Sequence, residues 1–320
     1  MPLSLSLAPL AGFTDAPFRR MCFEGGADLA YTEMVSAAGL AHGSSPTRHL
    51  METMPGEGPV ACQLFGANES DLAFAAAEVE KVRMRFVELN LNAGCPMAKV
   101  TREGAGAKLV ESPERVYRLL RAMRERTSLP VTLKTRLGPH PQRTVVLELA
   151  DAAERAGAVG LVVHARYTSQ MHGGEVHLET LAELVASTRL RVVGNGSVTD
   201  GATLAAMVAT GVAGVMIGRA ALGDPKIFRR LKEPCRAEES TPSSRLDDCR
   251  RHLGYLLEFR RQLAECYPDD HVPGEDAFAS VKMHTHLFRY FNGRPGAAAL
   301  RMKLNSIRTL REIYGIIKEQ

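Results

Sequence analysis

The sequence has no closely spaced pair among its six cysteines, which stand singly between Cys22 and Cys266. Structural zinc sites and iron–sulfur clusters draw their thiolates from short, regular spacings, so the pattern favours neither, and no metal site is predicted. A disulfide framework is also not expected in a chain of 320 residues without a secretory leader. Four cysteines are therefore predicted to be small buried or half-buried residues: Cys22, Cys62, Cys249 and Cys266.

Long apolar runs and a strong charge imbalance are missing as well. No run approaches the ~20 residues that a membrane span needs. The opening segment "MPLSLSLAPLAGF" lacks the basic region of a signal peptide. We therefore expect a cytoplasmic protein with no membrane segment. The formal net charge of +4 is too small by itself to indicate a polyanionic partner.

Short apolar runs rich in strand formers alternate with helical segments along the first 235 residues. Helical periodicity covers 69–85, 113–127, 143–156, 178–187 and 200–210. This repeated alternation predicts a (β/α)8 TIM barrel over 1–235. The eight predicted strands lie in "LSLAPLAG", "LAYTEM", "VACQLFG", "FVELNLN", "PVTLKTR", "GLVVHAR", "RVVGNGS" and "GVMIGRA".

A polar stretch ends this pattern, and we interpret 236–245 as a linker. Helical segments over 246–265, 277–291 and 296–318 then predict a small helical domain spanning 246–320. From Phe278 onward, Lys and Arg outnumber acidic residues by about six. A solvated helical face explains this excess as well as a nucleic-acid-binding surface does.

Polar side chains follow the predicted strands where each strand ends. The active site of a (β/α)8 barrel lies at this end, so these residues are candidates for function. Loop residues without a role would explain any one of them but explain the whole set poorly. The candidates are Gln63, Asn90, Asn92, Cys95, Lys134, Arg136, His164, Arg166, Asn195, Gly196, Gly218 and Arg219.

Two glycine-containing turns, "GNGSVTD" and "MIGRAALGDP", follow the seventh and eighth strands. Barrels build phosphate sites from such turns, and Arg219 adds positive charge. A ligand held there would extend toward Gln63, Lys134 and His164, and a flavin ring would use an amide and a nearby cation. A lysine inside an apolar barrel is costly unless it is paired, which favours a functional role for Lys134. His164 is equally well explained as a core histidine.

Several segments together resemble the tRNA-dihydrouridine synthase family, in order and over almost the whole chain. They include "LAPLAGFTDAPFR", "NLNAGCPMAKVTREGAGAKL", "VTLKTRLG", "VVHARYTSQMHGG" and "GVMIGRAALGDP". The resemblance, with a lean to the bacterial B-type members, implies an FMN-bound barrel and a small helical tRNA-binding domain. It also implies NADPH as the reductant, tRNA as the partner, and a monomer. Departures are Asn90, where the family usually carries Asp, Lys108, where a small residue is usual, and His284-Thr285-His286 with Arg289-Tyr290 in the helical domain.

The resemblance assigns roles to individual residues. Cys95 matches the catalytic cysteine of the family, and Asn92 lies beside it. The residues implied to contact FMN are Pro9, Ala11, Gln63, Lys134, His164, Asn195, Gly196, Gly218 and Arg219. Candidate substrate contacts are Asn92, Lys99, Arg102, Arg136, Arg166, Arg294, Arg301 and Lys303. For Arg136 and Arg166, simple surface pairing is as good an explanation.

Reducing the C5–C6 double bond of uracil needs a hydride on one carbon and a proton on the other, and FMN supplies only the hydride. A thiol with an ordinary pKa of ~8.5 is mostly protonated at neutral pH, so Cys95 is predicted to act as a general acid. An alternative is a small-molecule FMN ene-reductase or a dihydroorotate dehydrogenase-like enzyme, but neither needs a basic helical domain. A second alternative, an RNA-binding protein without catalysis, leaves Cys95, Lys134 and His164 unexplained.

Overall fold

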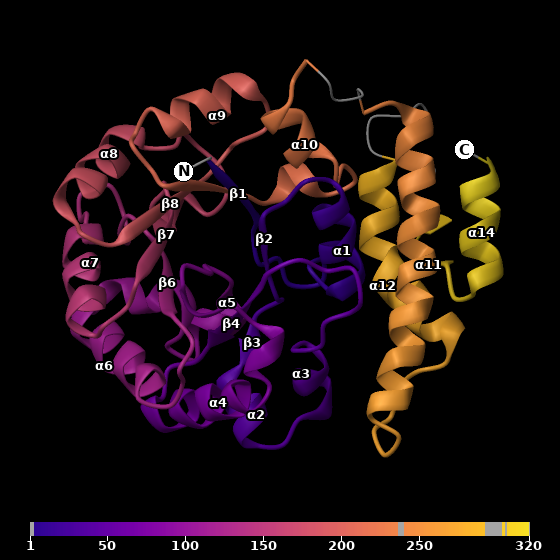
Figure 1. The fold of residues 1–320 in the computed structure, drawn as a ribbon, viewed down its shortest axis with the longest axis horizontal. Helices are drawn as coiled ribbons and strands as arrows, with labels where there is room; N and C mark the ends of the chain where they lie inside the picture. Colours follow the sequence, from indigo (N-terminus) through magenta and orange to yellow (C-terminus); the bar gives the residue numbers. More distant parts are fainter. Residues whose placement is uncertain (1–2, 236–239, 292–302, 305, 320) are drawn as a thin grey trace.

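The computed structural model describes residues 3–235, 240–291, 303–304 and 306–319. Nine strands of the described chain form one parallel sheet in the order β2-β1-β9-β8-β7-β6-β5-β4-β3, and a further β2–β4 pairing closes it into a barrel (Figure 1). The predicted TIM barrel is confirmed, and every predicted strand is present. The strands are β1 (Ser4–Leu7), β2 (Leu29–Tyr31), β3 (Val35–Ser36), β4 (Val60–Phe65), β5 (Glu88–Ala93), β6 (Val131–Arg136), β7 (Gly160–His164), β8 (Arg191–Asn195) and β9 (Gly214–Ile217).

Alternation along each strand sorts the side chains between two environments. In β5, Leu89 and Leu91 belong to the large core between strands and helices. Their neighbours Asn90 and Asn92 are also buried, but they bond to side chains of β4 and β6. Because successive side chains of a strand point to opposite faces, these amides lie inside the barrel. A small apolar cluster that includes Val162 and Met216 shares this interior.

Helices surround the strands in a ring (Figure 1). The predicted helix over 69–85 ends at Lys81 and is followed by a 3-10 turn at Arg83–Arg85. The helix predicted over 143–156 begins only at Val146, because Arg143 is bridged to His140. The main helices of this layer are α1 (Ala16–Glu24), α2 (Ala37–Ala41), α3 (Ser45–His49), α4 (Glu69–Lys81), α6 (Pro113–Arg124), α7 (Val146–Arg155), α8 (Leu178–Ser187), α9 (Gly201–Val208) and α10 (Ile227–Lys232).

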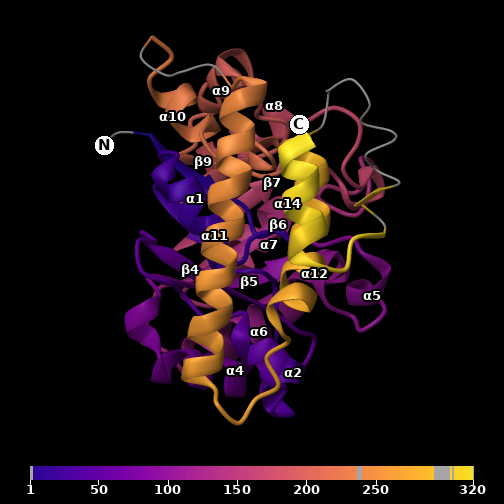
Figure 2. The same cartoon turned by 90° about the vertical axis from the view of Figure 1, so that its right-hand side faces the viewer.

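In the described part of the chain after the barrel, three helices of ten or more residues lie side by side next to one flank of the barrel (Figures 1 and 2). They are α11 (Pro242–Cys266), α12 (Glu275–Tyr290) and α14 (Leu310–Glu319), and they share a second hydrophobic core. The predicted helical C-terminal region is confirmed. Within the predicted linker, residues 236–239 lie outside the described part and α11 already begins at Pro242. The helix predicted over 296–318 is interrupted, since Ile307 and Arg308 are not helical.

The helical region docks on the barrel through α1 and the loops beside it. Tyr255 of α11 donates a hydrogen bond from its hydroxyl to Glu24 Oε1 at 2.8 Å. Lys282 of α12 places its Nζ 3.5 Å from Glu33 and 3.8 Å from Asp15. Charged and polar contacts therefore fix α11 and α12 against the N-terminal part of the barrel. The described helices include none that is both long and apolar enough to cross a membrane.

Candidate active site

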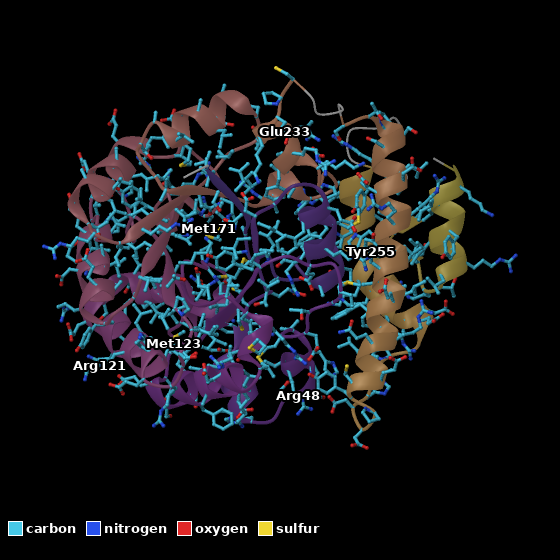
Figure 3. All side chains as sticks on the ribbon, in the orientation of Figure 1. Arg48, Arg121, Met123, Met171, Glu233 and Tyr255 are labelled. Carbon is cyan, nitrogen blue, oxygen red and sulfur yellow. The ribbon has the colours of Figure 1, made fainter. Side chains whose placement is uncertain are left out.

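The carboxyl ends of the strands bring most of the predicted site residues to one mouth of the barrel. Register pairs Asn92 with Lys134 across β5 and β6, and Arg136 with His164 across β6 and β7. His164 in turn pairs with Asn195 of β8. Side chains fill the ring of strands (Figure 3). Residues that are far apart in the sequence therefore form one continuous polar lining.

Lys134 is the most unusual member of this lining. Its Nζ donates to Asn195 Oδ1 at 3.4 Å, and Asn195 Nδ2 donates to the Met216 carbonyl at 2.8 Å. Burial, followed by the positive charge of Arg136, lowers the pKa of Lys134 to about 7. Burial also lowers the pKa of Arg136 to about 10. Cys95 offsets both shifts in part, but no carboxylate among the described residues does, so the mouth gathers cationic groups that suit an anionic ligand.

His164 is neutral in this setting. Burial lowers its pKa far below the ordinary range, and the charges of Lys134, Arg136 and Arg166 add to the effect. The Arg166 guanidinium lies 3.0 Å from His164 Nε2. Because a guanidinium can only donate, Nε2 is the acceptor and the ring proton is on Nδ1. His164 therefore offers one N–H donor, at Nδ1.

At the turn after β8, the backbone packs too closely against neighbouring side chains to leave room for a Cβ. Gly196 has φ of +134°, and a Cβ there would lie 2.9 Å from Val176 Cγ1 and 3.2 Å from His164 Cδ2. Ser197 follows with φ of 52°, which is uncommon for a residue with a side chain. Arg166 holds this turn by donating to Ser197 Oγ at 2.6 Å and to the Gly174 carbonyl at 2.8 Å.

The turn after β9 places Arg219 at the start of a short 3-10 segment, Arg219–Ala221. Its guanidinium is exposed and donates to the His172 carbonyl at 2.9 Å. Gly218 before it is half-buried, and a Cβ at this position would lie 3.6 Å from Ala8 Cβ. The two predicted phosphate turns therefore stand on adjacent strands, with the Arg219 cation beside them.

Cys95 lies just after β5 and is half-buried. The Asn92 Oδ1 accepts from the backbone N–H groups of Gly94 at 3.1 Å and Cys95 at 3.0 Å. Arg136 Nε donates to the Gly94 carbonyl at 2.7 Å, and the Cys95 carbonyl accepts from the Ala107 N–H at 2.8 Å. The backbone that carries the thiol is therefore fixed from several sides.

The other cysteines differ from Cys95. Cys22, Cys62 and Cys249 are buried as predicted, and burial raises the pKa of Cys62 to about 12. The prediction for Cys266 is wrong, because this thiol is exposed at the last residue of α11. Of the cysteines in the described chain, Cys95 is the one at the mouth of the barrel.

Two predicted substrate contacts, Arg136 and Arg166, are not surface residues. They are 1% and 4% exposed and donate to backbone carbonyls instead of pairing with carboxylates. Lys99 and Arg102, by contrast, are exposed on and just after α5 (Ala98–Thr101). The predicted substrate contacts therefore divide into a buried pair inside the mouth and an exposed pair beside it.

Three other predicted site residues that the structure describes lie in the loop after β1 or in the C-terminal region. Pro9 is half-buried and Ala11 is exposed, both in the loop that follows β1. Lys303 of the C-terminal region is exposed. Arg294 and Arg301 lie outside the described residues.

Sequence analysis missed two polar residues that support the lining, Glu88 and Thr132. Thr132 Oγ1 donates to Glu88 Oε1 at 2.5 Å and accepts from Asn90 Nδ2 at 2.7 Å. Each stands two residues before a predicted site residue, Glu88 before Asn90 and Thr132 before Lys134. The two-residue period of a strand was the signal that could have found them.

Comparison with known proteins defines the class of this barrel. Residues 6–318 match the family model described as "Dihydrouridine synthase (Dus)". A similar fold is found in the old yellow enzyme homologue from Zymomonas mobilis, with a TM-score of 0.50 and 11% identity over 75% of this chain and 91% of that one. The chain therefore belongs to the dihydrouridine synthase family.

Curated relatives agree with this assignment. The chain is 33% identical to "tRNA-dihydrouridine synthase B" of Pseudomonas putida over 95% of its own length and 87% of that protein. It is 31% identical to the protein of the same name in Escherichia coli K12, over 85% and 88% of the two chains. A probable tRNA-dihydrouridine synthase of Treponema pallidum is 31% identical over 92% and 87%.

Proposed function

We propose that the protein is a tRNA-dihydrouridine synthase that reduces the C5–C6 double bond of uridines in tRNA, with FMN bound in the barrel and NADPH as its reductant. The observation that carries the proposal is the position of Cys95. The thiol lies at the barrel mouth, on backbone that Asn92 and Arg136 hold, next to cations that lack carboxylate partners. The family match and the names of the relatives support the same reaction.

The residues of the mouth fit FMN. The phosphate of FMN would be held by the turns at Gly196 and Gly218 together with Arg219. Its ring would meet the Gln63 amide and the Lys134 ammonium, and the Nδ1–H of His164 would remain as a further donor. When bound, FMN supplies the hydride for one carbon of the double bond. An acceptor atom of the ring that bonds to Lys134 Nζ would favour the protonated form of this lysine.

Cys95 supplies the proton for the other carbon. Hydride addition leaves an enolate-like anion on uracil, and a positioned acid is needed to quench it. The hydrogen bonds from Gly94 and Cys95 to Asn92 Oδ1 fix the loop, so the thiol can be held in one place when the base arrives. Arg136 contributes by anchoring the Gly94 carbonyl, which makes it a positioning residue in this proposal.

The base must leave the stack of the RNA to reach this depth, as it does in other enzymes that act on bases. We propose that 1–235 form the catalytic domain and 246–320 a tRNA-binding domain joined by the segment 236–245. The exposed Lys99 and Arg102 beside the mouth and the basic C-terminal segment would then contact phosphates. Such a substrate implies a cytoplasmic enzyme.

Flavin reoxidation tests this function against the small-molecule alternative. The purified protein, loaded with FMN and reduced by NADPH, is mixed with tRNA, free uridine or orotate, and flavin absorbance is followed. We expect tRNA to reoxidise the flavin much faster than the small molecules, because contacts remote from the base position it. Equal rates with orotate and tRNA would favour a small-molecule reductase. A protein that cannot be loaded with FMN would refute the cofactor assignment.

A further inference from the structure

A continuous chain of hydrogen bonds crosses the interior of the barrel beneath the mouth. It starts at Glu88, the first residue of β5, whose Oε1 accepts from the Tyr31 hydroxyl at 2.9 Å and from Thr132 Oγ1 at 2.5 Å. Burial raises the pKa of Glu88, but both hydroxyl donors stabilise its charged form. Thr132 Oγ1 accepts from Asn90 Nδ2 at 2.7 Å, and Asn90 Oδ1 accepts from Gln63 Nε2 at 2.7 Å. The chain therefore links a half-buried carboxyl group at the amino end of β5 to an amide of the proposed flavin site.

The same chain continues to the catalytic loop. Gln63 Oε1 accepts from Asn92 Nδ2 at 2.8 Å, and Asn92 Oδ1 accepts from the N–H groups of Gly94 and Cys95. These amides are 0% exposed at Gln63 and Asn90 and 5% exposed at Asn92, so water does not compete for their bonds. Every link runs in one direction, with the donor on the side of the mouth and the acceptor on the side of Glu88.

The groups at the two ends of the chain fix the direction of these hydrogen bonds. A side-chain amide can present its oxygen and nitrogen either way round, so each amide in the row takes its orientation from its neighbours. At one end Glu88 Oε1 accepts from two hydroxyl groups, and at the other end backbone N–H groups can only donate. The single proton of the Thr132 hydroxyl goes to Glu88, which leaves its oxygen to accept from Asn90. Both ends therefore require the same orientation of all three amides.

We propose that Glu88 and Thr132 are positioning residues that set the orientation of the Gln63 and Asn92 amides and, through Asn92, the conformation of the Cys95 loop. The effect on catalysis rests on the proposed function. The effect on the conformation of the Cys95 loop does not, and it can be measured in a protein without FMN. Reversal of Asn92 would turn its NH2 group toward the N–H groups of Gly94 and Cys95. Donor would then face donor, and the loop would lose the bonds that hold it.

The test removes only the hydroxyl at the centre of the chain. Thr132→Val keeps the shape of the side chain but leaves Asn90 Nδ2 without its acceptor, whereas Thr132→Ser keeps the hydroxyl. Thr135→Val is the matched control, because Thr135 is a buried residue of the same strand whose hydroxyl faces the Ala93 carbonyl instead. If Thr132→Val does not fold, Thr132→Ala removes the same hydroxyl with less bulk.

The readout is the rate at which iodoacetamide alkylates Cys95 in the FMN-free protein, resolved by peptide mass spectrometry. The exposed Cys266 in the same sample serves as an internal reference. We expect alkylation of Cys95 to change by about fivefold or more in Thr132→Val, roughly the effect of one hydrogen bond. Thr132→Ser and Thr135→Val should match the natural chain. An unchanged rate in both Thr132→Val and Thr132→Ala would overturn the proposal.

Turnover distinguishes this proposal from the proposed function. In FMN-loaded enzyme, Thr132→Val should lower kcat for tRNA with little change in KM, and Thr132→Ser should restore it. If the natural chain forms no dihydrouridine while the alkylation difference is present, the proposed function fails and the hydrogen-bond chain stands. If the natural chain is active and Thr132→Val has the same kcat and the same alkylation rate, the chain has no positioning role.

Discussion

At the scale of single residues, the site depends on what surrounds each side chain more than on its identity. Lys134 and Arg136 stand two positions apart on β6, yet one faces a neutral amide and the other holds the Gly94 carbonyl. The strand-end pattern predicted that both lie at the mouth. It could not predict that Arg136 is buried and bonded to backbone, because that depends on where the loops after β5 and β7 fold.

Replacing Cys95 tests its proposed role as the acid. Cys95→Ala should keep its FMN and its reduction by NADPH, because the thiol serves the substrate. Turnover on tRNA should fall by roughly 10²–10⁴-fold, the usual contribution of a positioned general acid. Cys95→Ser should be nearly as slow, since a hydroxyl is a much weaker acid than a thiol. Single-turnover assays measure the loss. Near-normal rates for Cys95→Ala, or a protein without FMN, would contradict the assignment.

Lys134 predicts how FMN affinity depends on pH. Its pKa of about 7 in the FMN-free protein should rise when an acceptor atom of the flavin ring bonds to Nζ, so binding above pH 7 takes up a proton. The dissociation constant for FMN should therefore increase with pH between about 7 and 9, by at most about tenfold per unit. Fluorescence titration of FMN measures it. Lys134→Gln should bind more weakly, with a flatter pH profile; an affinity that rises with pH would contradict this prediction.

At the scale of elements, the sequence predicted those strands and helices whose positions depend on the local pattern of apolar and polar residues. The eight strands predicted from periodicity are all present and most helices were found the same way, but the two-residue strand β3 was not predicted. The break in the last predicted helix was missed, although Thr309 and Glu312 carry the signal of a helix start. Glu312 Oε2 accepts from the Thr309 N–H at 2.9 Å, and Thr309 Oγ1 accepts from the Glu312 N–H at 3.3 Å. This capping box begins α14 at Leu310.

The contact of α12 with the barrel depends on long-range charges that no local pattern reveals. Lys282 lies between Asp15 and Glu33, which are 6% and 7% exposed. Burial opposes its charge, but the two carboxylates more than compensate and raise the pKa of Lys282. The same three residues line a cavity of about 360 Å³ between the barrel and the helical region. The ion pairs of Lys282 therefore join the helical region to the barrel and are not ordinary surface ion pairs.

Removing this cation should loosen the junction. Lys282→Met leaves Asp15 and Glu33 without their positive partner, and we expect a loss of about 1–3 kcal/mol in the free energy of unfolding. Chemical denaturation measures it. The matched control is Lys81→Met, which breaks an exposed pair with Glu78 and should cost less than about 1 kcal/mol. Equal effects of the two substitutions would show that the Lys282 contacts add nothing.

At the scale of the whole molecule, the proposal divides the work between a barrel that carries the chemistry and a helical region that binds RNA. Reversing Arg294, Arg301 and Lys303 to Glu should raise the apparent KM for tRNA and reduce the salt dependence of binding, because fewer phosphates are neutralised. FMN content should not change. Filter binding at several salt concentrations measures the slope. Unchanged tRNA binding would mean that these charges form only a solvated surface.

Formation of dihydrouridine in tRNA by this protein can be read from the nucleoside content of the product RNA. Purified protein is incubated with FMN, NADPH and a tRNA transcript that contains no dihydrouridine, and the digested RNA is analysed by liquid chromatography and mass spectrometry. We expect uridine to be lost and dihydrouridine to appear, and both changes should require NADPH. A transcript that remains free of dihydrouridine, while the same flavin is reoxidised readily by orotate, would contradict this expectation.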